Sequence, residues 1–221
     1  MSTSLEKMQS AIQHPQVVDF FRGLFDSAGV RVTDTGETFT ADHTGTNVVF
    51  TEGLSEDRVD FTVEIRSAQI DLLLEYAGDG VLDDRERFRI MAVLAAPATQ
   101  GALQRPAIKN KLLRSALFKI GRAESLMHVS LASPNGEDDV THTIAYVDGQ
   151  WLVIAGRHGD VPHTYRLTVD DAVEYQRKML TARKANSITT WLAFAHWYGK
   201  LRKRVVVPAK APRTDTTTSP S

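Results

Sequence analysis

Hydrophobic side chains recur with two different periods along the chain, and these periods predict both helices and strands. In residues 15–29 they lie three and four positions apart, which predicts an amphipathic helix that begins at Pro15 and stops at Gly29. In residues 58–65 every second residue is hydrophobic, which predicts a half-buried strand. The chain is therefore predicted to adopt an α+β fold with mostly antiparallel strands and helices packed on one face of the sheet.

The same two patterns divide the rest of the chain. Further helices are predicted over residues 4–13, 67–78, 83–96, 105–121, 169–182 and 187–199, with Pro97 ending or kinking the segment 83–96. Further strands are predicted over residues 36–53 (two strands around a turn near 43–46), 124–133, 139–156 (a hairpin with Asp148-Gly149 at its tip), 163–169 and 201–207. Residues 209–221 contain almost no hydrophobic side chains and are predicted to be disordered.

The order of elements suggests an internal repeat. Residues 41–53 align with 145–157 so that Gly45 falls on Gly149, and a shift of about 103 then places Phe88 on Trp191. Both halves are predicted to contain a helix, a hairpin, a third strand and two helices. We therefore predict two similar lobes, 1–118 and 119–208, related by duplication or by chance similarity of small α+β units.

Three segments resemble the sterol-carrier-protein, or non-specific lipid-transfer, domain family. They are "VVFTEGLSEDRVDFTVEIRSAQIDLLLE" with its Phe-x-x-Gly loop, "RLTVDDAVEYQRKML", and "AHWYGKLRKRV" with an Ala-x-x-x-Gly-Lys-Leu pattern at Ala195, Gly199, Lys200 and Leu201. The resemblance covers most of residues 15–207, either as two degenerate tandem copies or as one copy spread over a longer chain. Two features depart from the family pattern: Val205-Val206 replaces a Gly-Asp pair, and the first half keeps Ala92 but lacks the Gly-Lys-Leu. The resemblance implies a five-stranded sheet covered by helices, an apolar tunnel for fatty acyl, sterol or similar ligands, and no universal catalytic residues.

Composition narrows the classes of function. The 221 residues are 42% hydrophobic and carry a formal net charge of −1, so the whole chain has no general attraction to nucleic acid or anionic membranes. The absence of cysteine excludes disulfides and thiolate chemistry. The polar N-terminus shows no signal peptide and no run of about 18 apolar residues occurs, so we expect a cytoplasmic protein without a transmembrane span.

The basic cluster at residues 200–204 lies next to Trp197 and Tyr198. Read as a strand, it is typical of a solvated sheet edge, where Lys and Arg discourage pairing with other chains. We therefore predict no nucleic-acid partner, while transient contact with a membrane surface stays open. The chain has 7 histidines, but none has a metal-ligand spacing on a clear element, and we predict no metal and no cofactor.

The resemblance to sterol-carrier domains implies a binding protein for an apolar small molecule of fatty acyl, sterol, polyketide or terpenoid type. Hydrophobic and aromatic side chains that would line its pocket are Phe61, Tyr76, Phe88, Met91, Tyr165, Met179, Trp191, Phe194 and Trp197. The alternative is a cofactor-independent enzyme of specialised metabolism, of cyclase or isomerase type, that uses the same pocket with His196 or Tyr198 as its polar group.

Overall fold

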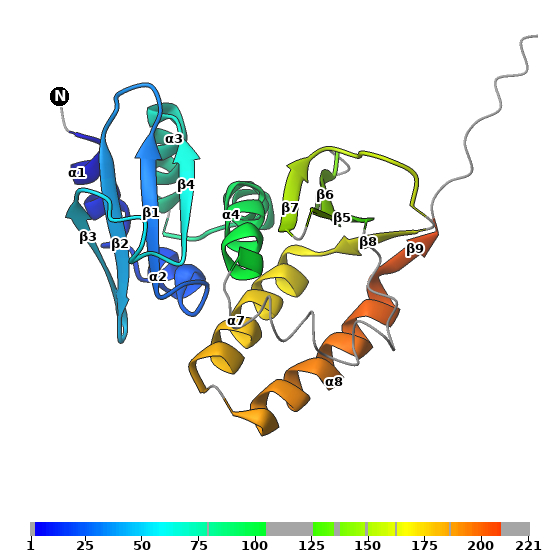
Figure 1. Ribbon diagram of the computed structural model, residues 1–221. Coiled ribbons are helices and arrows are strands. Elements are labelled where there is room, and N and C mark those ends of the chain that lie inside the picture. Colours follow the sequence, from blue (N-terminus) through cyan, green and yellow to red (C-terminus); the bar gives the residue numbers. More distant parts are fainter. Residues whose placement is uncertain are drawn as a thin grey trace, which may run out of the picture.

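The computed structural model describes residues 3–78, 80–104, 126–134, 138–148, 150–161, 163–185 and 187–208. Its α+β architecture, with strands that pair mostly antiparallel, is the predicted fold class. Two separate sheets lie on either side of the long helix α4, and α7 and α8 form a helical pair beside the second sheet (Figure 1). None of the described helices is long and apolar enough to cross a membrane.

The first half contributes eight described elements. They are α1 (Ser4–Ala11), α2 (Pro15–Phe21), β1 (Ser27–Val32), β2 (Thr38–Thr44), β3 (Asn47–Glu52), β4 (Phe61–Ile65), α3 (Ser67–Gly78) and α4 (Asp84–Gln104). The second half contributes β5 (Leu126–Leu131), β6 (Val140–Val147), β7 (Gln150–Ala155), β8 (His163–Leu167), α7 (Val169–Ala185), α8 (Ile188–Val205) and β9 (Val206–Pro208). The predicted helix at 105–121, the predicted lobe boundary at 118 and the tail 209–221 lie outside the described residues.

Both sheets have the same pattern of strand pairing. The first has the order β3-β2-β1-β4, and β1 is antiparallel to β2 and parallel to β4. The second has the order β7-β6-β5-β8-β9, in which β5 is likewise antiparallel to β6 and parallel to β8. The second sheet therefore contains the arrangement of the first and adds β9 as a fifth strand at its edge.

The correspondence extends to individual hydrogen bonds. The hydroxyl of Thr40 donates to the carbonyl of Gly53 at 2.9 Å, and that of Thr143 donates to the carbonyl of Gly156 at 2.8 Å. Both glycines have positive φ, 90° and 85°, which favours glycine after the third strand of each sheet. The offset between these residues is 103, so aligning 41–53 with 145–157 is wrong by one position in this hairpin.

The first strand of the fold was missed because its glycine was read as a helix stop. Helix α2 ends at Phe21, and Gly29 lies within β1 instead of ending a helix. Alternate residues Ala28, Val30 and Val32 are buried, which is the strand period. The preceding residues Phe20, Phe21, Leu24 and Phe25 have helical spacing, so the predicted helix was extended through them into this strand.

The predicted break at Gly199 is also wrong. Helix α8 continues through Gly199 to Val205, and the predicted strand over residues 201–207 is reduced to β9. Glycine costs a helix interior only about 1 kcal/mol. Leu201 and Val205, four residues apart, are both buried against the second sheet, and the basic last turn interacts favourably with the helix dipole.

Helix α4 joins the two sheets. It runs through Pro97 without ending there, packs against β4 on one side and approaches β7 on the other. The Gln100 side chain accepts a hydrogen bond from the Val153 amide at 2.7 Å and donates to the Trp151 carbonyl at 2.9 Å, which occupies the exposed edge of β7. One hydrophobic core cluster accordingly extends from the first half to Leu131 and Val173 in the second.

Candidate ligand-binding cleft

A cavity of about 420 Å³ lies between the first sheet and helices α3 and α4. This volume is within the range of about 300–1,000 Å³ that is typical of small-molecule sites. Its lining is almost entirely apolar and includes Met8, Phe21, Phe25, Ala28, Val30, Ala41, Val48, Phe50, Val63, Ile65, Ile70, Leu72, Leu73, Phe88, Ile90, Val93 and Leu94. The exposed side chain of Leu72 shows that the cavity reaches the surface along α3.

Two alanines on the floor of the cleft explain why space remains there. Ala28 and Ala41 face each other directly across β1 and β2, and both are buried. Their methyl groups are the smallest side chains, other than glycine, that a strand can present to a core. Larger residues surround them, so the sheet surface is hollowed at this pair.

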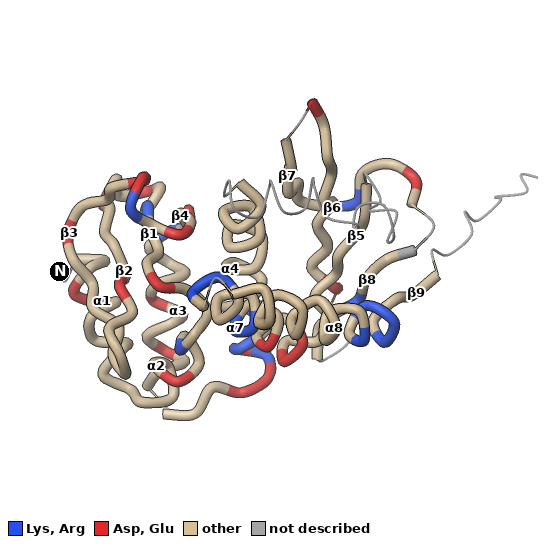
Figure 2. Tube along the Cα trace, turned by 60° about the horizontal axis from the view of Figure 1, so that its bottom comes forward, with Lys and Arg blue, Asp and Glu red and all other residues tan. Residues whose placement is uncertain are grey.

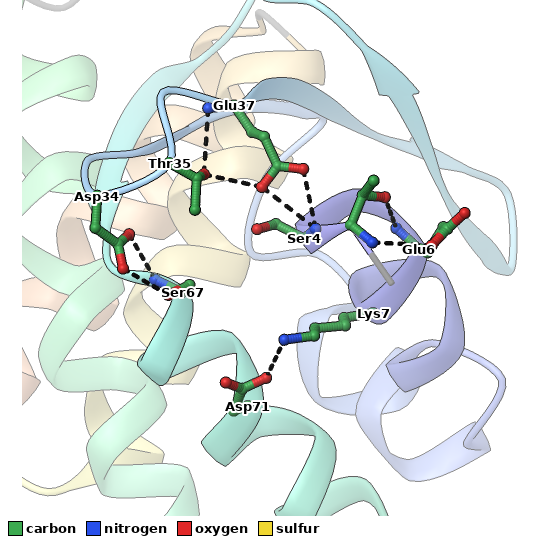
Figure 3. Close-up of polar contacts among 9 residues, drawn as sticks. Ser4, Glu6, Lys7, Asp34, Thr35, Glu37, Ser67 and Asp71 are labelled. Atoms are coloured by element: carbon green, nitrogen blue, oxygen red, sulfur yellow. Dashed lines mark hydrogen bonds and ion pairs between the residues drawn. The ribbon is translucent and has the colours of Figure 1, made fainter. Parts of the chain in front are cut away.

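Polar contacts hold the helices that wall the cleft (Figure 3). The Glu37 carboxylate accepts a hydrogen bond from the Ser4 amide at 3.1 Å, and Lys7 of α1 pairs with Asp71 of α3 at 2.6 Å. Asp34 accepts hydrogen bonds from the amide and hydroxyl of Ser67, at 2.9 and 2.5 Å. The bonds from Ser67 lower the pKa of Asp34, which therefore stays ionised at the first turn of α3.

One polar pair spans the cleft. The Arg89 guanidinium on α4 donates to the Tyr76 hydroxyl on α3 at 2.8 Å. Tyr76 is buried and Arg89 is half-buried, and among the described lining residues Arg89 is the single charged one. This pair and the Gln69 side chain are the polar points of an otherwise apolar described lining.

A second, smaller cavity of about 120 Å³ lies against the second sheet. Its described lining residues include Met127, Val129, His142, Ile144, Val153, Tyr165, Tyr175, Gln176, Tyr198 and Arg202, together with Met91 of α4. Ala92 and Val140 line both cavities, so only this thin wall separates the two. Arg202 donates to the Tyr165 hydroxyl at 2.7 Å in the wall of the smaller cavity.

The structure distributes the predicted pocket residues over several places. Tyr76 and Phe88 line the cleft, Met91 and Tyr165 line the smaller cavity, and Phe61 and Met179 line a narrow space of about 20 Å³ between β4 and α7. Trp191, Phe194 and Trp197 line none of these three spaces. They belong to an aromatic cluster between α7 and α8, in which Phe194 stacks on Tyr198 with 6.1 Å between ring centroids.

The two predicted polar groups differ in position. His196 is exposed on α8 and lines none of these spaces, whereas Tyr198 lines the smaller cavity. Desolvation of the Tyr198 hydroxyl by its neighbours raises its pKa, although the residue as a whole is 37% exposed, so the phenol is protonated at neutral pH and can donate a hydrogen bond.

Sequence reasoning did not identify Arg89 and His142 as lining residues. His142 alternates with Val140 and Ile144 along β6, so strand periodicity alone would have placed it on the cavity face. Arg89 had no comparable signal, because its role depends on a tyrosine of another helix.

Burial lowers the pKa of His142 below its ordinary value of 6.5. As the pH falls through this value, the unfolded chain gains a proton at His142 that the folded protein does not, so stability decreases until the pH passes the folded pKa. We expect His142→Phe to weaken the loss of stability between about pH 7.5 and about pH 5.5 in urea unfolding. Burial also lowers the pKa of His43, which is still present in the variant, so the part of the pH dependence that comes from His43 should remain. An unaltered pH dependence in the variant would contradict the assignment.

The basic residues of the predicted edge strand lie instead in the last turns of α8 (Figure 2). Arg202 is bonded to Tyr165, and Arg204 forms an ion pair with Asp171 of α7. Within the described ranges, no group of three His, Asp or Glu side chains is arranged to hold a metal ion.

Comparison with known proteins yields no relative: no family model matches the chain, and neither the curated proteins nor the solved structures contain a match.

Proposed function

We propose that the protein binds one apolar small molecule in the cleft between α3, α4 and the first sheet. The observation that carries the proposal is an apolar cavity of about 420 Å³ whose single described charged group, Arg89, is bonded to Tyr76. A ligand with a hydrocarbon body and one polar end, such as a fatty acid, a sterol or a polyketide, fits this arrangement. The resemblance of residues 48–75 to sterol-carrier domains supports the same class of ligand, and the cysteine-free composition supports action in the cytoplasm.

The expected affinity follows from the buried area. A ligand that buries about 450 Å² of apolar surface gains about 11 kcal/mol at about 25 cal/mol per Å². Association costs at least about 4 kcal/mol, which leaves about 7 kcal/mol and a Kd on the order of 10 µM. This strength suits a carrier, which must release its ligand as well as bind it.

The matching order and orientation of strands in the two sheets supports descent by duplication, with the second half keeping a fifth strand. In this proposal the first half retained the large cleft, and the cavity of the second half became smaller. His196 is exposed and lines none of the three cavities, so it does not support the alternative of an enzyme that uses His196 as its polar group.

Filling the cleft tests the proposal. We expect Ala41→Phe to weaken binding of a fluorescent long-chain acid, cis-parinarate, at least about tenfold, because the ring would occupy the hollow above Ala28. Fluorescence titration of delipidated protein measures the change, and thermal unfolding verifies that the variant folds. Ala68→Phe is the matched control, since Ala68 is exposed on α3 and does not line the cleft. Equal affinity of both variants would refute the cleft as the site.

A further inference from the structure

The cleft and the smaller cavity meet at two described residues that belong to both linings, Ala92 on α4 and Val140 at the start of β6. Both side chains are half-buried, and that of Ala92 is a single methyl group. The hydrophobic cluster that contains Phe88 of the cleft also contains Met91 and Leu131 of the smaller cavity. A hydrocarbon chain that passes this boundary therefore stays within one apolar core.

The smaller cavity suits a hydrocarbon end. Beyond Ala92, the side chains of α4 that line it are Ala95, Ala96 and Thr99. Arg202 and Tyr165 in its wall are bonded to each other at 2.7 Å, and a hydrocarbon end requires no hydrogen bond from either. Burial lowers the pKa of His142, so its imidazole, two residues from Val140 on β6, is neutral at pH 7.

The two volumes set the size of a chain that would occupy both spaces. An apolar cavity of about 150 Å³ holds one benzene molecule, which is about 25 Å³ for each carbon atom. On this scale the cleft of about 420 Å³ holds about 17 carbons, and the smaller cavity of about 120 Å³ takes about four more. A sterol of roughly 27 carbons would need about 675 Å³, more than both spaces together, and would protrude from the cleft. The volumes therefore favour a flexible chain over a fused ring system.

We propose that the cleft and the smaller cavity together bind one unbranched acyl chain of about 20 carbons, whose tail passes Ala92 and Val140 into the smaller cavity. The chain opens this passage by displacing the side chain of Val140, which lies at the end of its strand. The carboxyl end stays at the opening of the cleft, where Gln69 and Leu72 of α3 are exposed. This inference rests on the proposed function, since it names the class of ligand that the same cleft takes and the two residues that determine its length.

Fatty acids of different length test the reach of the tail. Each further CH₂ group that is buried should strengthen binding about fourfold, so a 20-carbon cis-monounsaturated acid should bind at least about tenfold more tightly than its 16-carbon analogue. Displacement of cis-parinarate from the delipidated full-length chain measures both affinities. Binding of the 16-carbon acid without a gain at 20 carbons would overturn this inference and leave the proposed function standing. Failure of the protein to bind any of these acids would overturn both.

Closing the boundary tests the route. Ala92→Leu should bring the affinities for the two acids within about threefold of each other, because the added carbons block the passage and leave most of the cleft open. Val140→Phe blocks the passage from the strand side and replaces Ala92→Leu if that variant does not fold. Ala68→Leu is the matched control, since Ala68 is exposed and lines neither space, and it should keep the gain. A gain that survives in the boundary variants would place the tail elsewhere and overturn the proposal.

NMR locates the end of the chain directly. Ile144 and Val153 pair across β6 and β7, and both line the smaller cavity but not the cleft. We expect nuclear Overhauser contacts between the terminal methyl group of the 20-carbon acid and the methyl groups of these two residues. The same contacts should be absent with the 16-carbon acid and in Ala92→Leu. Contacts of the 20-carbon acid restricted to cleft residues such as Val48 would show that the tail does not leave the cleft, which would refute the inference.

Discussion

Asp60→Ala is expected to lower the free energy of unfolding by about 3 kcal/mol, because it removes one partner of a partly buried ion pair between the two halves. The Asp60 carboxylate accepts hydrogen bonds from the Asp26 amide at 2.8 Å and from Arg183 of α7 at 3.0 Å. Its side chain is only 10% exposed, and that of Arg183 is 20% exposed. Without Asp60 the guanidinium keeps Asp26 but loses its more buried partner, and the amide of Asp26 loses its acceptor.

Urea unfolding measures this effect against an exposed control. Asp84 pairs with Arg87 at 3.5 Å, but its side chain is 81% exposed, so Asp84→Ala should change stability by less than about 1 kcal/mol. A double-mutant cycle with Arg183→Ala then isolates the coupling between α7 and the start of β4, which should be about 1 kcal/mol or more. Similar small effects of Asp60→Ala and Asp84→Ala would show that this contact does not hold the halves together.

Gly101→Ala is expected to destabilise the protein by about 2 kcal/mol, although alanine is the better helix former. Gly101 lies in α4 where the helix crosses the beginning of β4. A Cβ atom there would stand 2.4 Å from the Asp60 carbonyl oxygen and 2.8 Å from the Phe61 Cβ. Because the nearest of these atoms belongs to backbone that β1 pairing holds in place, the helix itself must move.

Gly199→Ala is the matched control and should have the opposite sign. Gly199 lies inside α8, and apart from its chain neighbours and the backbone of its own helix no described heavy atom lies within 4 Å of the place of its missing Cβ. The substitution should therefore stabilise the protein by about 1 kcal/mol, the difference in helix propensity. Destabilisation at Gly199, or stabilisation at Gly101, measured by chemical unfolding, would contradict the packing of these two helices.

Local pattern predicted most of the elements correctly. The alternation in β4, the hairpin of β6 and β7 and helix α3 all follow from hydrophobic spacing and turn residues close in sequence. The errors occurred where a glycine was read as a stop, at Gly29 and Gly199, and of the two outcomes expected at Pro97, an end or a kink, the end is wrong because α4 continues through it. In each case tertiary contacts outweighed a local penalty of a few kcal/mol at most.

The candidate site was predicted less completely. Tyr76 and Phe88 were named among nine pocket residues and do line the cleft, but the prediction could not separate them from Trp191 or Phe194, which pack in an aromatic cluster. Composition and spacing indicate which side chains are buried. They do not indicate whether the buried side chains fill the core or leave a cavity, because both kinds of core are built from the same residue types. Arg89 was not predicted as a lining residue, because its role depends on Tyr76, which belongs to a different helix.

The sequence by itself determined the α+β class and the faces that are buried, because strand and helix periods follow from covalent geometry. Only the tertiary structure decided where space remains. The register of β1 against β2 brings Ala28 opposite Ala41, and the matching register in the second sheet brings Met127 opposite Ile144. Whether a cavity forms depends on whether such non-local pairs bring small or large side chains together, and no single segment encodes these pairs. The cleft and the smaller cavity could therefore be located only from the tertiary structure.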